Sequence, residues 1–398
     1  MRRTTPGASF ARVAPPFKPF ASEAALTQMM RIALVVPGGV DRSGEYRVIP
    51  ALLALIARLS ALHEVHVFAL SQEAGRGEWN LAGARIHNVG TRHTRLRTLR
   101  LICARHRSSR FDVVQAIWSG ACGEIAVAAA TLLRIPSAVH VAGGELVALR
   151  DLGYGGALNW RGRLREALVL RRASAVTAAS APILRLLADL RIPAQRLALG
   201  VDLGMWPPRL PLRRARGVPA RLIQVASLNR VKDQPTLLRA LASVAAAGFN
   251  FQMDIVGDDT LQGEIQALAQ RLGLSHRVNF RGFMTQRQLR PLVQAADLMI
   301  VSSRHEAGPL VLLEAAAVGV PTVGTAVGHV AEWAPDASVA VPVGDPDALA
   351  DAIMRLLADE DLRLGIARSA LERATREDAD YTAGRFQALY LSLSGRTG

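Results

Sequence analysis

Short, continuously apolar runs alternate with longer segments of helical periodicity in the first half of the chain. The apolar runs end at glycine, proline or polar turns, as the strands of a buried sheet do. Residues 46–59 and an alanine-rich stretch that ends at Leu133 have helical periodicity. Strands separated by helices of this length predict a parallel sheet with helices on both faces. The predicted strands cover residues 31–36, 64–70, 111–117, 136–142, 174–180 and 196–200.

A second alternating set begins after residues 206–220, where proline and arginine replace periodic structure. This stretch, WPPRLPLRRARGVPA, is the predicted linker between two domains. Two doubly wound halves in tandem predict a cleft between the carboxyl ends of their strands, where ligands of such sheets bind. The second set predicts strands at residues 221–227, 251–257, 278–282, 297–303, 321–326 and 338–343, and helices at residues 234–247, 286–296, 346–358 and from 361 onward.

Length and composition support this division. At 398 residues the chain is too long for one ordinary core, and half of its residues are hydrophobic. Cys103 and Cys122 are too few for a disulfide framework or a metal site, so a reducing cytosol is the simplest setting. No apolar run approaches the roughly 20 residues that a membrane-spanning helix needs. We therefore expect a cytoplasmic α/β protein without a bound metal.

The first residues predict no packed structure. Residues 1–29 contain several prolines and basic residues but lack the apolar segment of a secretory signal. They are expected to be either a disordered arm or the product of a start assigned too early. The second alternative arises because Met29 and Met30 directly precede the first strand.

The net charge of +15 comes almost entirely from arginine and is unevenly distributed. A cluster between Arg92 and Arg110 should attract anions such as acidic lipid headgroups, phosphorylated sugars or nucleic acid. Aromatic residues are scarce there, so nucleic acid is the least supported partner. A peripheral contact with the inner face of the cytoplasmic membrane and a plain solvated face both remain as interpretations. The cluster consists of Arg92, Arg95, Arg97, Arg100, Arg105, Arg107 and Arg110.

Two glutamates, Glu306 and Glu314, lie eight positions apart in the stretch 302–332. Glu306 follows an apolar strand, and Glu314 falls within a helical run that opens at Pro309, a favoured first helical residue. Glu314 would then lie five residues into the helix, roughly 7–8 Å along its axis at about 1.5 Å per residue. The free N–H groups between the two carboxylates would suit a phosphate. A sugar, a diphosphate and a ribose fit this layout; helix capping and a surface position are the alternative.

Lys232 follows the first strand of the second half and is one of very few lysines in the chain. It is a candidate partner for a diphosphate, with an ordinary exposed lysine as the alternative. The turn Pro37-Gly38-Gly39 lets the backbone approach a ligand closely, because glycine lacks a Cβ. This turn is not a GxGxxG sequence, and no P-loop sequence occurs. His140 is not accompanied by a nucleophile-elbow sequence, so no catalytic triad is predicted.

The segment HEAGPLVLLEAAAVGVPTVGTAVGHVAE resembles the E-x7-E region of glycosyltransferase family 4, retaining enzymes of the GT-B fold. The resemblance continues through DIVG, VNFRG and AADLMIVSS, and in the first half through PGG, FDVVQA, VAGGEL and LALGVD, over about residues 30–390. It implies two Rossmann-like doubly wound domains that face a central cleft. Residues 30–205 would bind the acceptor and residues 221–375 the nucleotide-sugar. Residues 376–398 would form a helix that crosses back to the N-terminal domain.

The resemblance also implies residue roles. Glu306 would bind hydroxyls of the donor sugar, and Glu314 would bind the ribose hydroxyls. Lys232 would neutralise the leaving diphosphate, so Lys232 and Glu306 are the implied catalytic residues. Gly39 would let its turn close over the diphosphate. The other implied donor contacts are Ser227, Arg230, Val278, Gly308, Pro309, Leu310 and Val311, and the acceptor-side candidates are Gly38, His140, Gly143 and Glu145.

Three positions depart from the family pattern: Ser227 replaces a common arginine, and Ala142 and Gln115 replace histidines. These changes weaken acceptor activation more than donor binding. The resemblance implies a retaining, metal-independent transfer from a nucleotide-diphosphate sugar, without a cofactor, to a glycan or lipid-linked acceptor in cell-envelope or exopolysaccharide synthesis.

Three other interpretations of the sequence stand beside this one. A weakly active sugar-nucleotide-binding partner subunit of the same fold is the main alternative, and the three departures favour it. The E-x7-E spacing and Lys232 argue against a sugar-nucleotide epimerase of this fold. A nucleic-acid-binding protein has support only from the basic charge.

Overall fold

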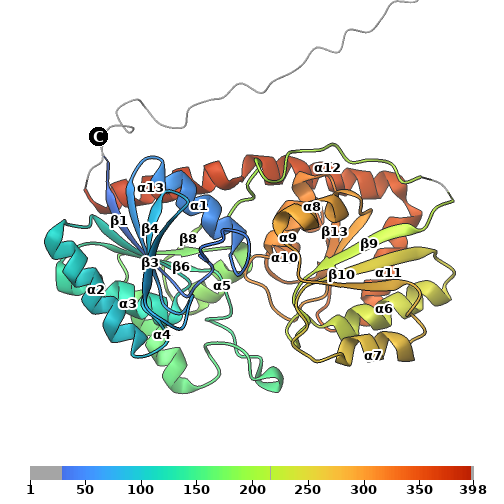
Figure 1. The fold of residues 1–398 in the computed structure, drawn as a ribbon. Coiled ribbons are helices and arrows are strands. Elements are labelled where there is room, and N and C mark those ends of the chain that lie inside the picture. Colours follow the sequence, from blue (N-terminus) through green and yellow to red (C-terminus); the bar gives the residue numbers. More distant parts are fainter. Residues whose placement is uncertain (1–28, 216, 396–398) are drawn as a thin grey trace, which may run out of the picture.

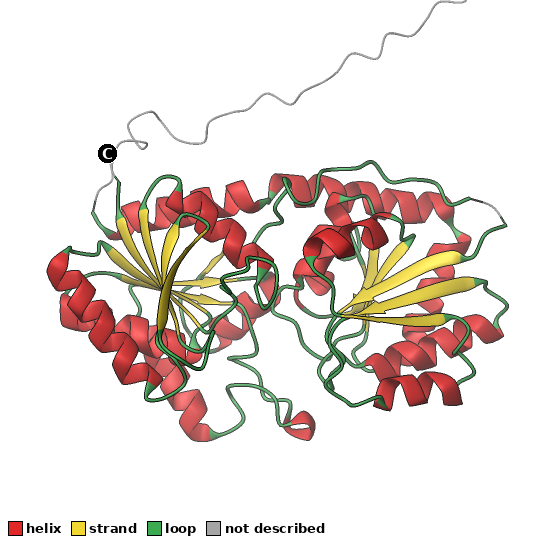
Figure 2. Ribbon diagram, in the orientation of Figure 1, coloured by secondary structure: helices red, strands yellow, loops and turns green. Residues whose placement is uncertain are grey.

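The computed structural model describes residues 29–215 and 217–395, which form two α/β domains side by side (Figure 1). Each domain has one sheet between layers of helices (Figure 2). The predicted class, two doubly wound halves, is therefore confirmed. The predicted arm falls almost wholly outside the described residues.

The sheet of the N-terminal domain has eight strands in the order β3-β4-β2-β1-β5-β6-β7-β8. All neighbouring strands are parallel except β3 and β4, which form an antiparallel pair at one edge. The strands are β1 (Arg31–Val36), β2 (Glu64–Ala69), β3 (Gly77–Leu81), β4 (Ala84–Asn88), β5 (Val113–Ile117), β6 (Ser137–Val141), β7 (Ala175–Ala178) and β8 (Gln195–Arg196).

Helices cover both faces of this sheet. Buried side chains of α1 pack with the strands on one face, and those of α3 and α5 pack on the other. The helices are α1 (Pro50–Ser60), α2 (Thr94–Ser108), α3 (Gly120–Leu133), α4 (Trp160–Arg172) and α5 (Ala181–Asp189), with a short 3-10 turn, η2, at Arg150–Leu152.

The sheet of the C-terminal domain has six parallel strands in the order β11-β10-β9-β12-β13-β14. They are β9 (Ala220–Val225), β10 (Phe251–Val256), β11 (Val278–Gly282), β12 (Leu298–Val301), β13 (Thr322–Thr325) and β14 (Val339–Val341). The helices of this half are α6 (Gln234–Ala246), α7 (Glu264–Arg271), α8 (Gln286–Gln294), α9 (Leu310–Ala317), α10 (Gly328–Trp333), α11 (Pro346–Ala358) and α12 (Glu360–Arg376).

Local sequence explains where several of these helices begin. The carboxylates of Asp233 and Asp345 accept hydrogen bonds from backbone N–H groups in the first turns of α6 and α11, which have proline at an early position. Thr285 and Gln288 form a reciprocal capping box at the start of α8. These starts lie after strands, so they fix the loops that border the cleft.

The last helix, α13 (Ala379–Leu393), lies along the N-terminal domain although it follows α12 of the other domain (Figure 1). It packs against α1, and its buried residues Ala383, Phe386 and Tyr390 belong to the same core as β1 and β2. The chain therefore crosses between the domains twice, once before β9 and once between α12 and α13.

Candidate functional site

The loops that follow β9 and β12 meet at the mouth of the cleft. Lys232 Nζ lies 2.5 Å from Glu306 Oε1, and Ser303 Oγ donates to the same oxygen at 2.7 Å. Among the described residues, Glu306 Oε2 has no protein partner. The carboxylate is thus held through one oxygen while the other is free to accept hydrogen bonds from a ligand.

Hydrogen bonds to backbone groups order the loop after β9 and join it to the loop after β12. Asn229 Oδ1 accepts from the N–H groups of Val231 and Lys232 at 3.0 and 3.1 Å. Ser302 Oγ donates to the Lys232 carbonyl at 2.8 Å, and the Arg304 N–H donates to the Val231 carbonyl at 2.7 Å. Because β9 and β12 are adjacent strands, their carboxyl ends bring Lys232 and Glu306 together from positions 74 residues apart.

The helix after this loop is α9, and Pro309 is its N-cap with extended backbone rather than its first helical residue. The helix therefore begins one residue later than predicted, at Leu310. No side chain caps it, so the first N–H groups face the loop. Gly308, just before, has no room for a Cβ because His329 Nε2 would lie 2.7 Å away.

Glu314 lies deeper in the same helix and is buried. Burial raises the pKa of its carboxyl group to about 7. A hydrogen bond of 2.9 Å from Gln286 Nε2 opposes this shift but does not cancel it. Gln286 Oε1 in turn accepts a hydrogen bond from Trp206 Nε1 at 2.5 Å. No cation is paired with Glu314 among the described residues. This carboxyl group can therefore be neutral near pH 7.

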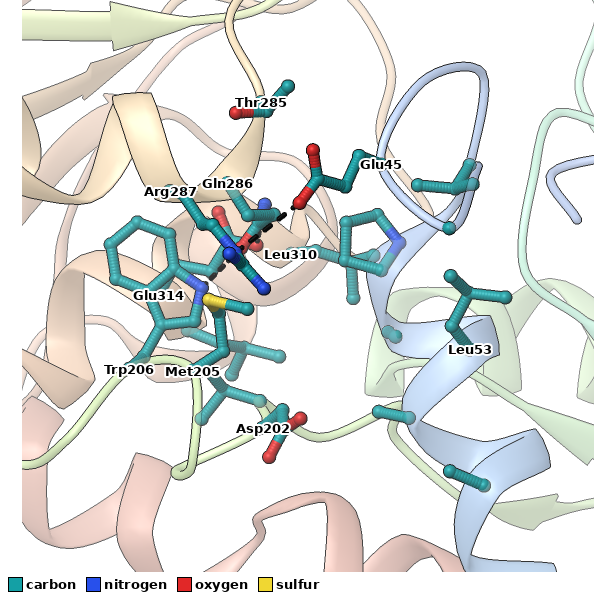
Figure 3. A pocket seen from close by; sticks show the side chains of 18 of the residues that line it. Glu45, Leu53, Asp202, Met205, Trp206, Thr285, Gln286, Arg287, Leu310 and Glu314 are labelled. Atoms are coloured by element: carbon teal, nitrogen blue, oxygen red, sulfur yellow. Dashed lines mark hydrogen bonds and ion pairs between the residues drawn. The ribbon is translucent and has the colours of Figure 1, made fainter. Parts of the chain in front are cut away.

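Glu314 opens onto a pocket between the two domains (Figure 3). One wall is formed by α1 and the loop before it, and the other by residues 201–206 and the starts of α8 and α9. Arg287 and Glu45 form an ion pair of 3.3 Å across its mouth. The pocket is mainly apolar, with Leu53, Met205 and Leu310 among its lining residues.

A second pocket adjoins Lys232 and Glu306 and is completed by the N-terminal domain. Its N-terminal wall includes Gly143 and Tyr154. His305 Nε2 lies 3.2 Å from the Gly143 carbonyl oxygen, and the rings of His305 and Tyr154 are 6.2 Å apart. Both domains thus contribute to the space in front of Lys232.

Glu145 holds this wall from behind. Its carboxylate accepts hydrogen bonds from the backbone N–H groups of Gly143 at 2.7 Å and Ser119 at 3.1 Å. Desolvation raises the pKa of Glu145, although these hydrogen bonds oppose the shift. The geometry favours a structural role, since both carboxylate oxygens are occupied by backbone groups.

Comparisons with known proteins agree with this arrangement. The family profile "Glycosyl transferases group 1" matches residues 214–375, and the profile "Glycosyl transferase 4-like domain" matches residues 48–200. The two matches fall on the two domains and cover both sides of the cleft. The chain belongs to the group 1 glycosyltransferases.

Relatives of this group 1 glycosyltransferase include a D-inositol 3-phosphate glycosyltransferase of Corynebacterium urealyticum, 34% identical over 193 residues, which is 46% of each chain. The match thus spans about half the length of that relative. A glycogen synthase of Mycobacterium tuberculosis is 27% identical over 349 residues, covering 85% of this chain and 80% of the relative.

Solved structures establish the fold. Sucrose-phosphate synthase from Thermosynechococcus elongatus aligns with a TM-score of 0.77 and 19% identity, over 92% of this chain and all of the other. The Anabaena HepE protein in complex with UDP-glucose aligns with a TM-score of 0.69 and 20% identity, over 91% and 99% of the two chains. The predicted GT-B fold is thereby confirmed.

The structure places two predicted site residues of the group 1 glycosyltransferase, His140 and Val278, away from the cleft. His140 is fully buried in β6, where Nδ1 lies 2.9 Å from Thr177 Oγ1 and the ring packs on Phe386 of α13. Burial lowers its pKa to about 3. Val278 begins β11 at the end of the sheet away from the cleft, and its side chain lies in the core. Neither side chain faces the cleft.

The remaining predicted positions lie near the cleft without a decisive contact. Gly39 has a positive φ of 81°, and a Cβ there would lie 2.6 Å from the side chain of Ile49. Gly38 packs beside Gln72. The Ser227 carbonyl accepts from Gln234 Nε2 at 3.2 Å. Arg230 is exposed and lines the same pocket as Lys232.

The departures from the family pattern have different surroundings. Gln115 is fully buried within β5, and its side-chain N–H donates to the Ala116 carbonyl at 2.7 Å. Ala142 is half-buried directly after β6 and offers no polar group. The first of these positions does not face the cleft, so its change bears on the core of the sheet.

Sequence reasoning missed Tyr154, His305 and Glu332. Tyr154 follows an irregular glycine-rich loop, and no periodic pattern marks it. His305 directly precedes Glu306, and that adjacency was the available signal. In the sequence, Glu332 only follows a glycine turn. In the structure it contacts residues of both domains.

Glu332 joins three parts of the molecule. Its Oε1 forms an ion pair with Arg196 Nε at 2.6 Å and accepts a hydrogen bond from Arg373 at 2.6 Å, and its Oε2 accepts from the Ala181 N–H at the start of α5 at 2.8 Å. Burial alone would raise its pKa, but His329, the Ala181 amide and Arg196 hold the pKa at about 2. Beside it, Ser180 Oγ donates to the Ala307 carbonyl, next to Glu306.

The structure offers no preformed metal site in the ranges 29–215 and 217–395, where no group of three or more candidate ligand side chains converges. Within the same ranges, no helix has the length and apolar character needed to cross a bilayer.

Proposed function

We propose that this group 1 glycosyltransferase moves a sugar from a nucleotide-diphosphate sugar to a glycan or lipid-linked acceptor, with retention at the anomeric carbon. The observation that carries the proposal is the pair Lys232–Glu306, held at 2.5 Å where the loops after β9 and β12 meet. The Anabaena HepE protein, which is similar in fold, was solved in complex with UDP-glucose, and this supports a nucleotide-diphosphate sugar as the donor.

The charges of the loops after β9 and β12 and of the start of α9 suit a nucleotide-diphosphate sugar. The diphosphate would lie between the Lys232 ammonium and the unpaired N–H groups at the start of α9, where positive potential is concentrated. Glu306 Oε2 would accept hydrogen bonds from sugar hydroxyls. Glu314 would bind the ribose from its pocket, and the base would lie near the residues after β11 rather than at Val278.

The reaction breaks the bond between the anomeric carbon and the β-phosphate oxygen and forms one to the acceptor oxygen. The electron pair of the broken bond goes to the leaving diphosphate, and the acceptor hydroxyl gives its proton to that phosphate oxygen. Lys232 and the start of α9 supply the positive charge that stabilises the leaving group. The half of the cleft formed by Gly143 and Tyr154 would exclude water from the oxocarbenium-like sugar.

The acceptor would approach from the N-terminal domain in cell-envelope or exopolysaccharide synthesis at the cytoplasmic side of the membrane. The alternative is a partner subunit that binds the sugar nucleotide but turns it over weakly. Ala142 favours it, because this position beside the cleft has no side chain that could activate an acceptor.

A panel of nucleotide-sugars tests the proposal by calorimetric binding and by release of the nucleotide. The native chain should bind one donor class with saturation and release nucleotide when acceptor is present. Lys232→Met should lower turnover by about a hundredfold or more, as loss of a charge-stabilising donor does. Arg271→Gln, which removes an exposed charge on α7, is the matched control and should leave turnover unchanged.

The outcomes separate the two functions. Saturable donor binding without nucleotide release, with every acceptor tried, would favour the partner subunit. Absence of binding to any nucleotide-sugar would contradict both functions. Unchanged turnover in Lys232→Met would contradict the role of Lys232 in the transfer.

A further inference from the structure

Helix α4 presents large apolar side chains to solvent. Trp160, Leu164 and Leu168 are 62%, 61% and 48% exposed, and they are spaced four residues apart. Residues at this spacing lie along one face of a helix. The opposite face of α4 already packs into the domain through Val169 and Leu170. The outer stripe is therefore not needed to attach α4 to the fold.

Arginines border this stripe on both sides. On α4 the only acidic residue, Glu166, is turned inward, where its carboxylate accepts from the Gly120 N–H at 3.2 Å. Arg165 is paired with Glu124 at 3.2 Å. No acidic side chain of the described residues pairs with the other four, which are Arg161, Arg163, Arg171 and Arg172. The outward face of α4 is thus apolar along its centre and cationic along its edges.

Helix α2 extends the basic surface but not the apolar one. Glu124 of α3 pairs with Arg95 of α2 at 2.8 Å and with Arg165 of α4 at 3.2 Å, so both helices lie next to α3. Leu96 is the one large apolar side chain that α2 exposes strongly. Arg105 is also paired, with Glu78 at 2.6 Å. The cluster predicted at residues 92–110 can therefore attract anions, but it offers little to bury.

We propose that α4 docks on the surface of an anionic bilayer. Trp160, Leu164 and Leu168 enter the boundary between headgroups and acyl chains, while the flanking arginines contact lipid phosphates. A helix with an apolar stripe, a tryptophan and a cationic rim has the chemistry of interfacial binding. A tryptophan at one end of the stripe suits this boundary, since its ring is apolar and its N–H is polar. The cluster on α2 adds long-range attraction.

The position of α4 links this surface to the cleft. Asn159 caps the helix by accepting from the Gly162 N–H at 2.7 Å, and the chain just before it is the loop that carries Gly143 and Tyr154. Figure 2 shows α4 at the outer edge of the N-terminal domain, away from the C-terminal one. Docking there would bring the acceptor wall next to the bilayer. The choice of a lipid-linked acceptor rests on the proposed function, but the docking itself does not.

The test is sedimentation of the full chain with phosphatidylcholine vesicles that contain or lack phosphatidylglycerol. The native chain should bind the anionic vesicles and lose binding as salt rises. Leu164→Gln/Leu168→Gln should weaken binding at least about tenfold, because apolar burial supplies part of the affinity. Leu210→Gln/Leu212→Gln is the matched control, since these leucines are 77% and 66% exposed in the linker and lie off α4.

Charge is tested separately with a second matched pair. Arg161→Gln/Arg172→Gln should weaken binding to anionic vesicles several-fold and leave the weak binding to neutral ones unchanged. Arg271→Gln/Arg368→Gln removes the same charge from exposed positions on the C-terminal domain and should have a much smaller effect.

Tryptophan fluorescence gives a readout that does not depend on activity. Of the five tryptophans, all within the described residues, only Trp160 is exposed. Anionic vesicles should shift its emission to the blue, and lipids brominated on their acyl chains should quench it. Trp160→Phe should abolish both signals while binding is largely kept.

Several results would overturn the proposal. These are equal binding of neutral and anionic vesicles, native affinity in Leu164→Gln/Leu168→Gln, or quenching that persists in Trp160→Phe. A salt-insensitive dimer that the leucine variant dissociates, with no vesicle binding by the native chain, would assign the stripe to a second copy instead. Donor binding measured without vesicles should be unchanged in every α4 variant, so failure of docking is distinguishable from failure of the proposed function.

Discussion

Glu306 and Glu314 differ more than their shared spacing suggests. Glu306 is paired with a cation at the mouth of the cleft, whereas Glu314 is buried with only the amide of Gln286 as a partner. A buried carboxyl without a cation favours its neutral form. The two acids therefore differ in charge environment, and they suit different parts of a donor.

Replacing Glu314 should change how stability depends on pH. Its pKa is about 7 in the folded chain and 4.5 as an ordinary glutamate, so the folded state favours the proton. This group lowers the stability of the native chain as pH rises from about 4.5 to 7. In Glu314→Gln the loss is absent, and the variant should gain about 3 kcal/mol relative to the native chain between pH 4.5 and 8.

Urea unfolding at pH 5 and pH 8 measures this difference in the free energy of unfolding. A difference between variant and native chain that is the same at both pH values would contradict the burial argument. If Glu314 also binds the ribose, nucleotide affinity should fall in the same variant while Glu372→Gln, at an exposed position on α12, leaves it unchanged.

The sequence allowed the donor side of the site to be predicted better than the opposite wall. Lys232 and Glu306 follow adjacent parallel strands, so topology alone brings them together. His140 was misplaced because both faces of β6 are covered, by α3 and by α13. Only residues beyond the carboxyl end of such a strand reach the cleft. Tyr154 could not be predicted, since an irregular loop determines its position.

At the scale of elements, α13 follows the C-terminal domain in the sequence but packs into the core of the N-terminal domain. Its Phe386 is fully buried against the N-terminal core and packs on His140 at a ring distance of 5.6 Å. Tyr381, one turn earlier, is 39% exposed. One helix thus offers a buried and an exposed aromatic residue for comparison.

Phe386→Ala should destabilise the N-terminal domain by about 3–5 kcal/mol, because it removes a buried ring and leaves a cavity. Tyr381→Ala should cost much less. Limited proteolysis, followed by identification of the cut sites, reports which domain opens. Cleavage confined to the C-terminal domain in Phe386→Ala would contradict the packing.

The pattern of apolar residues predicted the buried strands of both sheets but not the hairpin of β3 and β4. Those two strands lie at the edge, and residues of β3 alternate between half-buried and exposed. Their sequences, GEWNL and ARIHN, are rich in polar residues, so no continuous apolar run marks them. Edge strands are recognised by their neighbours more than by their own composition.

At the scale of the molecule, Glu332 connects the domains. It receives Arg196 and the Ala181 N–H from the N-terminal domain and Arg373 from α12. Ser180, which precedes α5, donates to the Ala307 carbonyl beside Glu306. These contacts therefore join the two domains next to the loop that carries Glu306.

Glu332→Gln should destabilise the closed arrangement by about 2–4 kcal/mol, because it leaves two arginines without their shared partner. Its folded pKa of about 2 lies below the ordinary 4.5, so its contribution is complete above pH 4.5 and is lost as pH falls toward 2. The difference between native and variant should thus disappear in acid.

Thermal unfolding at pH 7 and pH 3 and small-angle scattering measure the two effects. The radius of gyration should increase in the variant at pH 7. Asp361→Asn removes the exposed ion pair with Arg213 and is the control, with an expected cost below about 1 kcal/mol. An unchanged radius together with native stability would contradict the role of Glu332.

The return of α13 to the first domain also defines what can be exchanged between relatives. A chimera joined within residues 206–220 would combine one protein's first domain with another protein's last helix. Ala383, Phe386 and Tyr390 would then have to fit a core in which they did not evolve. The unit that can be recombined intact is residues 29–205 together with residues 379–393, two pieces at opposite ends of the described chain.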